Sequence, residues 1–331
     1  MKYSFIVPTY NSERWIQPCI NSILAQTYSK FDIIILDSGS IDGTLEWIKS
    51  TGDNRIRIYT TDRRLDIVEN WGRITGIPKN EFMTIMGHDD ILYPNYLATV
   101  DKLIERFPDA GLYQTHFNFI DGKGQLIRAC VPMKTHITAV EFLEGVLQNT
   151  IEITATGFMV RSKEYDSIGG IPSYPNLLYA DTELWLKLIL QNYLAVAEEI
   201  CFEFRFHIDN TSKSAGLIRL TAFERMVDFF SQLKNENPEY KLLIEQNAFA
   251  FLKSYVIGSC HKLIYVSKVN RGKVTIQSII SSAKKCAEKI IPRSKFIPEH
   301  FKEIHLAKFI DSNSITRSMF LFYKSFKKRT F

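Results

Sequence analysis

Residues 31–44, FDIIILDSGSIDGT, decide the fold of this chain. The stretch Phe31–Leu36 is a continuous apolar run rich in isoleucine, which is typical of a strand buried on both faces. A polar loop follows at Asp37–Ser40, and the residues near Thr44–Lys49 are predicted to form a helix. A buried strand that leads through a polar loop into a helix is the unit of an α/β sheet.

The same alternation of strand and helix extends in both directions from this stretch. We expect a strand at Lys2–Val7 that Pro8 ends, and a helix to about Gln26 that Ser12 caps. Further strands and helices are predicted at Arg55–Tyr59, Ile67–Ile77, Phe82–Met86 and Pro94–Phe107. This rhythm predicts a largely parallel sheet with helices on both faces, and such sheets bind ligands beyond the carboxyl ends of their strands.

The pattern changes after Leu112, and the chain is expected to divide in two. A hairpin is predicted for residues 112–131, helices for 139–147 and 181–191, and one or two strands for 195–206. Beyond Lys213 the amphipathic pattern is mainly helical. Residues 1–215 hold 20 Lys and Arg against 27 Asp and Glu, and residues 216–331 hold 21 against 9. We therefore expect an acidic α/β domain at 1–215 and a basic, mainly helical region at 216–331.

The composition excludes several classes of protein. Hydrophobic residues make up 45% of the 331 and charged residues 23%, a globular balance that argues against disorder. Five scattered cysteines without a CxxC pair argue against a disulfide framework or a zinc site. No apolar run reaches the ~20 residues that cross a bilayer, and the first apolar run is too short for a signal peptide. We expect a cytoplasmic protein, peripheral to the inner membrane face at most.

Five motifs agree with one family in order and spacing. Residues 4–44 resemble the opening of the family 2 glycosyltransferases, and the resemblance continues through four later segments. These are Asn70–Arg73, His88–Asp90, Ala180–Trp185 and Arg205–His207. The resemblance implies a GT-A fold: a nucleotide-sugar-binding α/β domain with a mixed, largely parallel sheet, followed here by a helical C-terminal region.

The resemblance also implies a set of residues that bind the nucleotide-sugar. They are Pro8, Thr9, Tyr10, Asn11, Asp37, Ser38, Arg73, Asp89 and Arg205. A carboxylate at Asp37 can accept directional hydrogen bonds from a base or ribose. Ser38 stands where similar enzymes often carry a second aspartate, so UDP, dTDP and GDP donors all stay open. The alternatives are a plain turn at 37–40, a core role for Tyr10 and a solvated helix position for Arg73.

Asp90 and His207 are the expected metal ligands by the same resemblance. A departing diphosphate needs a hard cation, and Mn²⁺ or Mg²⁺ prefers oxygen ligands while keeping positions open for phosphate oxygens. The alternative for Asp89 and Asp90 is a capping pair at the helix that Pro94 opens. For His207 the alternative is a purely structural role.

Asp181 matches the position of the family's catalytic base. Inverting transfer needs a group that removes the proton of the acceptor hydroxyl, and a carboxylate does so well when burial raises its pKa. The alternative role for Asp181 is the N-cap of the helix that follows. Glu183 is the second candidate for the base. Thr156–Gly157 would line the acceptor site, or serve packing alone.

The sequence thus predicts an inverting, metal-dependent transfer of sugar from a nucleoside diphosphate to an acceptor hydroxyl of a saccharide or lipid-linked saccharide, in surface polysaccharide or glycolipid synthesis. The competing interpretations are a nucleotidyltransferase and an inactive nucleotide-sugar or polysaccharide-binding protein. The segment Met319–Arg329 mixes aromatic and basic residues, which suits either an anionic membrane surface or a packed terminal helix. No nucleic-acid module is present, and no such partner is expected.

Overall fold

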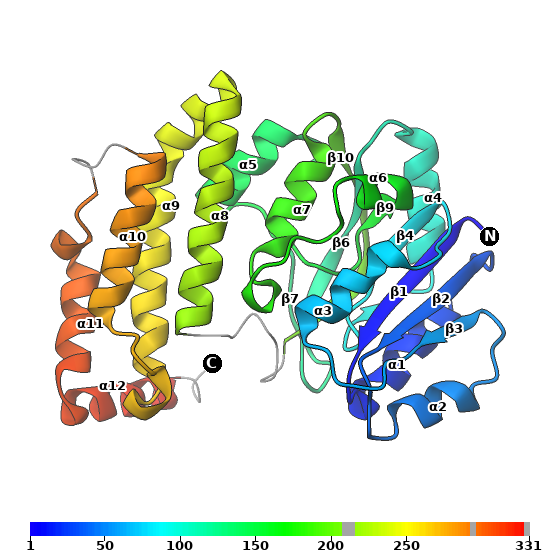
Figure 1. Cartoon of the computed structure of the whole chain (residues 1–331), viewed down its shortest axis with the longest axis horizontal. Coiled ribbons are helices and arrows are strands. Elements are labelled where there is room, and N and C mark those ends of the chain that lie inside the picture. Colours follow the sequence, from blue (N-terminus) through cyan, green and yellow to red (C-terminus); the bar gives the residue numbers. More distant parts are fainter. Residues whose placement is uncertain (207–215, 292–295, 328–331) are drawn as a thin grey trace. The chain divides into compact units, whose positions relative to one another are not determined.

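A ten-stranded mixed sheet forms the centre of the N-terminal part of the chain (Figure 1). The structure is a computed structural model, and it describes residues 1–206, 216–291 and 296–327. The main path of the sheet is β3-β2-β1-β4-β9-β6-β10-β5, with β7 beside β6 and β8 beside β10. The strands are β1 Tyr3–Thr9, β2 Phe31–Asp37, β3 Ile56–Tyr59, β4 Phe82–Ile85, β5 Ile91–Leu92, β6 Leu112–Asp121, β7 Leu126–Ala129, β8 His136–Thr138, β9 Met159–Arg161 and β10 Tyr193–Phe206.

The directions of the strands confirm the expected mixed, largely parallel sheet. The pairs β1–β2, β2–β3, β1–β4 and β6–β10 are parallel, whereas β9 runs antiparallel to β4 and β6. The shorter strands β5, β7 and β8 also pair antiparallel. Because β1, β2 and β4 are parallel neighbours, the loops that follow them leave the sheet at the same edge.

Helices cover both faces of this sheet (Figure 1). They are α1 Glu13–Leu24, α2 Thr44–Ser50, α3 Ile67–Gly72, η1 Arg73–Gly76, α4 Tyr96–Arg106, α5 Ala139–Gln148, α6 Ser162–Ser167, η2 Pro175–Leu177 and α7 Ala180–Ile189. On β1 the alternate residues Tyr3, Phe5 and Val7 join one core cluster with residues of α1 and α4. Ile6 faces the other way and is also fully buried. The apolar runs read from the sequence are therefore strands covered on both sides.

Several local predictions were wrong in detail. Pro8 does not end its strand, because β1 continues through Pro8, which lies opposite Leu36 of β2. The pairing of β1 with β4 ends at Ile6, so the backbone N–H that Pro8 lacks is not needed on that side. Ser12 precedes α1 but does not cap it, since its hydroxyl bonds Thr9 Oγ1 at 2.6 Å. The predicted helix at 67–77 is α3 followed by the 3-10 turn η1.

The chain divides into two compact units. The first comprises Met1–Val146 and Thr150–Thr211, and the second comprises Leu147–Asn149 and Ser212–Phe331. The second unit is helical: α8 Leu217–Glu236, α9 Pro238–Tyr265, η4 Lys268–Arg271, α10 Ile276–Ile290, η6 Pro298–His300, α11 Lys302–Ser312 and α12 Ser314–Lys327. Within it, α8, α9 and α10 pack against one another, α11 packs on α9, and α12 on α11.

All five cysteines are free and buried, and they are spread over both units. They are Cys19, Cys130, Cys201, Cys260 and Cys286. Within the part of the chain that the structure describes, no helix has the length and apolar character that crossing a membrane requires.

Candidate functional site

Asp37 ends β2 and is completely buried. Its carboxylate accepts hydrogen bonds from the backbone N–H of Gly39 at 3.0 Å and of Ser40 at 3.1 Å, and from Thr60 Oγ1 at 2.8 Å. Gly39 has a φ of +71°, which this tight loop requires. In the described structure the Asp37 carboxylate therefore stabilises the loop after β2 and connects this loop to the end of β3.

Ser38 fastens the segment between β3 and α3 to the end of β2. Its hydroxyl donates to the carbonyl of Leu65 at 2.9 Å and accepts from the N–H of Leu65 at 2.7 Å. Its own N–H donates to the Thr9 carbonyl at 3.0 Å. The small hydroxyl at this position thus fixes one wall of the sheet edge.

The loop after β1 is locked to the loop after β2. Asn11 has a φ of +44°; its N–H donates to Ser40 Oγ at 2.9 Å, and its side-chain oxygen accepts from the N–H of Ile41 at 2.9 Å. The Tyr10 ring lies partly exposed under the Arg64 guanidinium, 4.5 Å from the ring centre. Pro8, Thr9, Tyr10 and Asn11 therefore stand with Asp37 and Ser38 at one edge of the sheet.

Arg73 anchors α3 and η1 to the strand ends from within the protein. Its guanidinium donates to the carbonyls of Asp37 and Tyr59, each at 2.9 Å, and to Asn70 Oδ1 at 2.9 Å. Burial lowers the pKa of Arg73. Asn70 donates to the Leu36 carbonyl at 2.9 Å. In the described structure Arg73 supports the loops of the edge through their backbone.

Asp89 and Asp90 follow β4 and converge on the backbone of Gly87. A Cβ placed on Gly87 would lie 2.8 Å from Asp89 Oδ1 and 2.7 Å from Asp90 Oδ2. The other oxygen of Asp90 accepts the backbone N–H of Arg205 at 2.8 Å. Burial, and after it the negative charge of Asp89, raises the pKa of Asp90 well above its ordinary value. Asp90 is buried and Asp89 half-buried, and the charge of Arg205 acts on Asp90 in the opposite direction to the charge of Asp89; a positive charge beside two neighbouring carboxylates favours their ionised form.

The interpretation of Asp89 and Asp90 as helix caps is wrong. The pair precedes β5, a strand that the sequence analysis missed, and the residue before α4 is Asn95. Thr156 contributes to the same corner, since its hydroxyl accepts the N–H of Gly87 at 3.1 Å and bonds Asp90. The sequence places Gly87 with His88–Asp90 after the fourth strand, but neither its close approach to the two carboxylates nor this role of Thr156 was predicted.

Arg205 is buried and braces this corner from β10. Its Nε donates to the Asp89 carbonyl at 2.7 Å, its Nη1 to the Asp121 carbonyl at 3.2 Å, and its guanidinium lies 4.9 Å from the centre of the Trp15 ring. The described contacts therefore hold the loop that carries both aspartates. His207, the other expected metal ligand, lies outside the described residues.

The donor set fits a hard divalent cation that completes its coordination with phosphate oxygens. In residues 1–206, 216–291 and 296–327 no group of three His, Cys, Asp or Glu that could hold a metal occurs. At phosphate sites the protein commonly contributes one or two carboxylates to Mg²⁺ and similar ions, and phosphate oxygens and water complete the coordination. The convergence of Asp89 and Asp90 over Gly87 is the feature that makes this fit.

Asp181 lies in the first turn of α7, inside the helix and not at its cap, which is Tyr179. Burial raises the pKa of Asp181 to about 6, and Asp181 Oδ1 accepts the N–H of Thr182 at 2.9 Å. Glu183, the second candidate, is already engaged: Tyr174 OH donates to it at 2.6 Å, and Lys187 pairs with it at 2.6 Å. Asp181 therefore has a pKa suited to a general base at neutral pH.

The segment before α7 has a strained backbone. Asn176, Leu177 and Tyr179 have φ values of +51°, +54° and +67°, which residues other than glycine rarely adopt. Here η2 packs against α3, the helix whose Asn70 and Arg73 hold the strand ends. Strain of this kind persists only where the surroundings enforce it, and it clusters at functional sites.

A separate surface cavity of about 480 Å³ lies by β6, β7 and β10. None of the residues predicted for the site lines it; its walls include His116, Cys130, Met133 and Lys134. The cavity is therefore distinct from the edge where the aspartates gather.

The sequence and the fold both resemble known proteins. Residues 4–166 match the model of "Glycosyl transferase family 2". An uncharacterized glycosyltransferase of Rickettsia felis is 26% identical over 223 residues, which are 63% of this chain and 35% of the relative, so the chain spans about a third of that protein's length.

Two solved structures share the fold. One is residues 1–349 of S. aureus TarS in complex with UDP-GlcNAc, with a TM-score of 0.60 and 15% identity over 88% of this chain and 82% of that one. The other is the mannosyltransferase PcManGT from Pyrobaculum calidifontis in complex with GDP-Man and Mn²⁺, with a TM-score of 0.50 and 16% identity over 85% of each chain. Residues 4–166, which hold most strands of this GT-A-type sheet, therefore form a glycosyl transferase family 2 domain.

Proposed function

We propose that the protein is a metal-dependent, inverting glycosyltransferase that moves a sugar from a nucleoside diphosphate to an acceptor hydroxyl. The observation that carries this proposal is the convergence of Asp89 and Asp90 over Gly87 at the carboxyl edge of the sheet. Family membership supports the class of reaction, and the sugar nucleotides in the two similar structures, UDP-GlcNAc and GDP-Man, support the class of donor.

In this proposal the edge of the sheet receives the donor. Pro8–Asn11, Asp37 and Ser38 form the wall against which base and ribose bind, with Arg73 fixing that wall from behind. Asp89 faces the ribose or sugar, and Arg205 holds the Asp89–Asp90 loop toward the diphosphate. Asp90, together with His207, is the proposed ligand of Mn²⁺ or Mg²⁺.

A divalent cation at Asp90 supplies charge neutralisation for the leaving diphosphate. Asp181 takes the proton of the acceptor hydroxyl while the oxygen forms a bond to the anomeric carbon. The bond from that carbon to the diphosphate oxygen breaks in the same step, so configuration inverts and a nucleoside diphosphate leaves. A carboxyl with a pKa of about 6 is largely ionised at neutral pH and still basic enough to accept this proton.

We further propose that the acceptor is a saccharide or a lipid-linked saccharide, used in building a surface polysaccharide or glycolipid at the cytoplasmic membrane face. The basic composition of residues 216–331 supports a partner with negative charge, as lipid-linked phosphates have.

A thermal-shift screen tests the donor and the metal together. UDP, dTDP and GDP are each added with and without Mn²⁺, and the melting temperature is expected to rise for one nucleotide in the presence of the ion, since a ligand of the native state stabilises it. The matching nucleotide-sugars are then assayed for metal-dependent release of the nucleoside diphosphate.

The outcomes separate the competing functions. Stabilisation with turnover supports the transferase, whereas stabilisation without turnover of any donor indicates a nucleotide-sugar-binding protein. Stabilisation by a nucleoside triphosphate, with release of pyrophosphate, would indicate a nucleotidyltransferase. An Asp90→Asn variant that responds to nucleotide and Mn²⁺ as the native protein does would refute the proposed metal site.

A further inference from the structure

Helix α12 (Ser314–Lys327) turns its apolar side chains outward. Ile315, Met319 and Phe322 are 70%, 67% and 70% exposed. Their spacing of four and three residues places them on one face of the helix. A helix that packs on a soluble domain ordinarily buries such a face and exposes its polar one. The direction in which α12 presents its apolar face therefore needs a reason.

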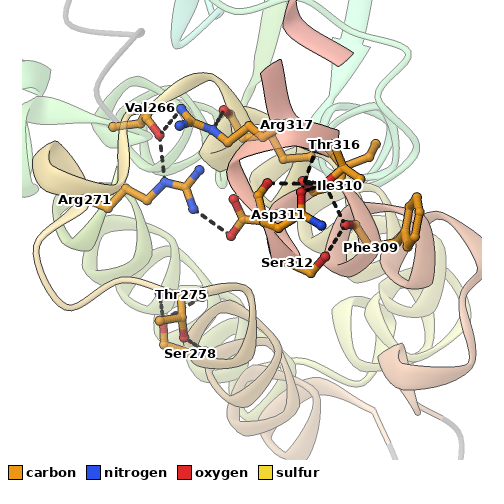
Figure 2. A network of polar contacts seen from close by, with 12 residues as sticks. Val266, Arg271, Thr275, Ser278, Phe309, Ile310, Asp311, Ser312, Thr316 and Arg317 are labelled. Atoms are coloured by element: carbon orange, nitrogen blue, oxygen red, sulfur yellow. Dashed lines mark hydrogen bonds and ion pairs between the residues drawn. The ribbon is translucent and has the colours of Figure 1, made fainter. Parts of the chain in front are cut away.

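Polar contacts hold the opposite face of α12 against its unit, as Figure 2 shows. Arg317 donates to the carbonyls of Ile264 and Val266, each at 2.8 Å, and Thr316 Oγ1 donates to the Ile310 carbonyl at 2.9 Å. Helix α9 ends at Tyr265, so these acceptors belong to a helix end where carbonyls lack partners within the helix. The cation of Arg317 suits this end of the helix dipole.

A second arginine strengthens the same anchor. Arg271 donates to the Val266 carbonyl at 2.7 Å and pairs with Asp311 at 2.7 Å, and its side chain is almost completely buried (Figure 2). Asp311 belongs to α11, so one network joins the end of α9 to both terminal helices. Charged hydrogen bonds in a buried place are directional, and they fix the rotation of α12 about its axis. These contacts hold α12 in the orientation that exposes its apolar face.

Helix α11 (Lys302–Ser312) also exposes apolar side chains. Leu306 and Phe309 are exposed and lie three residues apart on one side of the helix, and the Phe309 carbonyl accepts a hydrogen bond from Thr316 Oγ1 at 3.3 Å. The two helices pack on each other. We name this set the α11–α12 surface: Leu306, Phe309, Ile315, Met319 and Phe322.

The sequence is basic toward the end of the chain. Lys324 of α12 is exposed, whereas Arg317 donates to the end of α9; from Ser312 onward the sequence also contains Lys327, Lys328 and Arg329, and no acidic residue. Pairing two copies of the surface would bring these cations together. A layer of anionic headgroups instead offers opposite charge to the cations and an acyl boundary to the apolar side chains.

From this combination we propose that the α11–α12 surface binds anionic lipid, with α12 lying in the plane of the membrane interface. The apolar side chains enter the headgroup boundary, and the exposed ammonium group of Lys324 contacts lipid phosphates. Because no helix in the described ranges is long and apolar enough to span a bilayer, this binding is a surface association.

Sedimentation with sucrose-loaded vesicles tests the proposal on the full chain. One vesicle preparation is phosphatidylcholine alone, and the other also contains phosphatidylglycerol. We expect the protein to pellet with the anionic vesicles only, and less so in high salt. Met319→Glu is expected to lower the partition coefficient about tenfold or more, since it removes one apolar side chain that would enter the headgroup boundary and adds a negative charge.

Leu242→Glu is the matched control. Leu242 is 60% exposed on α9, far along that helix from its anchored end, so the variant has the same change in charge outside the surface. It should pellet as the native chain does. Ile315→Glu is a second variant on the surface, and equal melting temperatures show that all variants fold.

Equal pelleting of the native chain, Met319→Glu and Ile315→Glu would overturn the proposal, as would no pelleting with anionic vesicles. Concentration-dependent dimers that Met319→Glu abolishes, without lipid binding, would assign the surface to a second copy. Release of nucleoside diphosphate with a soluble acceptor is measured in parallel. It should be unchanged in Met319→Glu, so failure of the membrane proposal is distinct from failure of the proposed reaction.

Discussion

The lack of a side chain at Gly87 leaves room for the carboxylates of Asp89 and Asp90. Both carboxylates of the pair lie less than 3 Å from the place where a side chain at this position would begin. Any larger residue must therefore push Asp89 and Asp90 apart or displace the loop that carries them. The absence of a side chain at Gly87 makes the convergence of the two carboxylates possible.

Replacing Gly87 by alanine should thus abolish the response to metal while the protein still folds. We expect Gly87→Ala to lose the rise in melting temperature that nucleotide and Mn²⁺ together produce, and to lower turnover at least about a hundredfold. Gly76→Ala is the control, because a Cβ at Gly76 meets nothing within 4 Å. A normal Mn²⁺ response in Gly87→Ala would place the metal elsewhere.

Asp181 should show opposite effects on activity and stability. Its pKa of about 6 in the folded chain exceeds the ordinary value of about 3.9, so the folded state binds more protons between pH 4 and 6. Stability contributed at this site is therefore lost as the pH rises through that window, and above pH 6 the charged carboxylate costs about 1–3 kcal/mol.

Asp181→Asn removes that cost together with the base. We expect turnover to fall about 10²–10⁴-fold, while the melting temperature at pH 7.5 rises above that of the native chain and approaches it near pH 4. Native turnover should rise with pH on an acidic limb near pH 6. The exposed Asp109→Asn serves as control for both measurements. A variant that keeps its turnover would exclude Asp181 as the base.

At the scale of elements, side chains from one loop hold the backbone of the next. Ser38 joins the end of β2 to Leu65, and Asp66 and Glu69 form a reciprocal capping box at the start of α3. Arg73 then ties this helix to the carbonyls of two strands. The wall of the proposed donor site is therefore held by hydrogen bonds between side chains of one loop and the backbone of the next.

Ser38→Ala should loosen this wall. Losing the hydroxyl leaves both the N–H and the carbonyl of Leu65 without this partner, which should cost about 1–3 kcal/mol in the free energy of unfolding. Affinity for the nucleotide should fall with it, measured by the concentration dependence of the thermal shift. Ser50→Ala, at an exposed helix end, is the matched control. Equal nucleotide affinity in Ser38→Ala would show that the wall does not depend on this link.

The sequence predicted the elements well where apolar period and length agreed. β2, α2, α5 and the β6–β7 hairpin lie where the pattern put them, because a local pattern suffices for them. The two-residue strand β5 was missed, since its place depends on pairing with β10 more than a hundred residues later. The prediction at Pro8 was wrong for a similar reason, because a proline ends a strand only if its missing N–H is needed for pairing with a neighbouring strand.

For the site, the sequence named Asp37, Asp89, Asp90 and Asp181 as candidates, but it could not predict the contacts that hold them. The backbone N–H of Arg205 on Asp90 and the links of Arg73 to strand carbonyls join distant segments. Such main-chain contacts have no signature in the pattern of residue types. The roles assigned to Asp37, Asp90 and Asp181 remain predictions for the experiments above to test.

Across the whole molecule, ion pairs differ greatly in what they hold together. The pair of Arg271 and Asp311 is almost buried and joins η4 to α11, whereas both side chains of the pair of Lys289 and Asp228 are exposed. Breaking a buried pair leaves a charge without compensation, while an exposed pair is screened by water. The helical unit should therefore depend on the first pair far more than on the second.

Arg271→Met should destabilise the helical unit by about 3–5 kcal/mol, because Asp311 loses its cation and the Val266 carbonyl loses a donor. Lys289→Met should cost at most about 1 kcal/mol. Urea unfolding followed by circular dichroism measures both. Similar midpoints for the two variants would mean that the terminal helices are not held by Arg271.

The burial of every cysteine has a practical consequence for studying this chain in solution. Burial raises the pKa of Cys260 and Cys286 to about 12, and it raises the pKa of Cys19, Cys130 and Cys201 as well. The thiolate is the form of cysteine that attacks maleimides, so the native thiols are nearly inert to such reagents. A fluorophore could therefore be attached at one newly introduced surface thiol without deleting any native cysteine, and its emission would report the polarity around that single position.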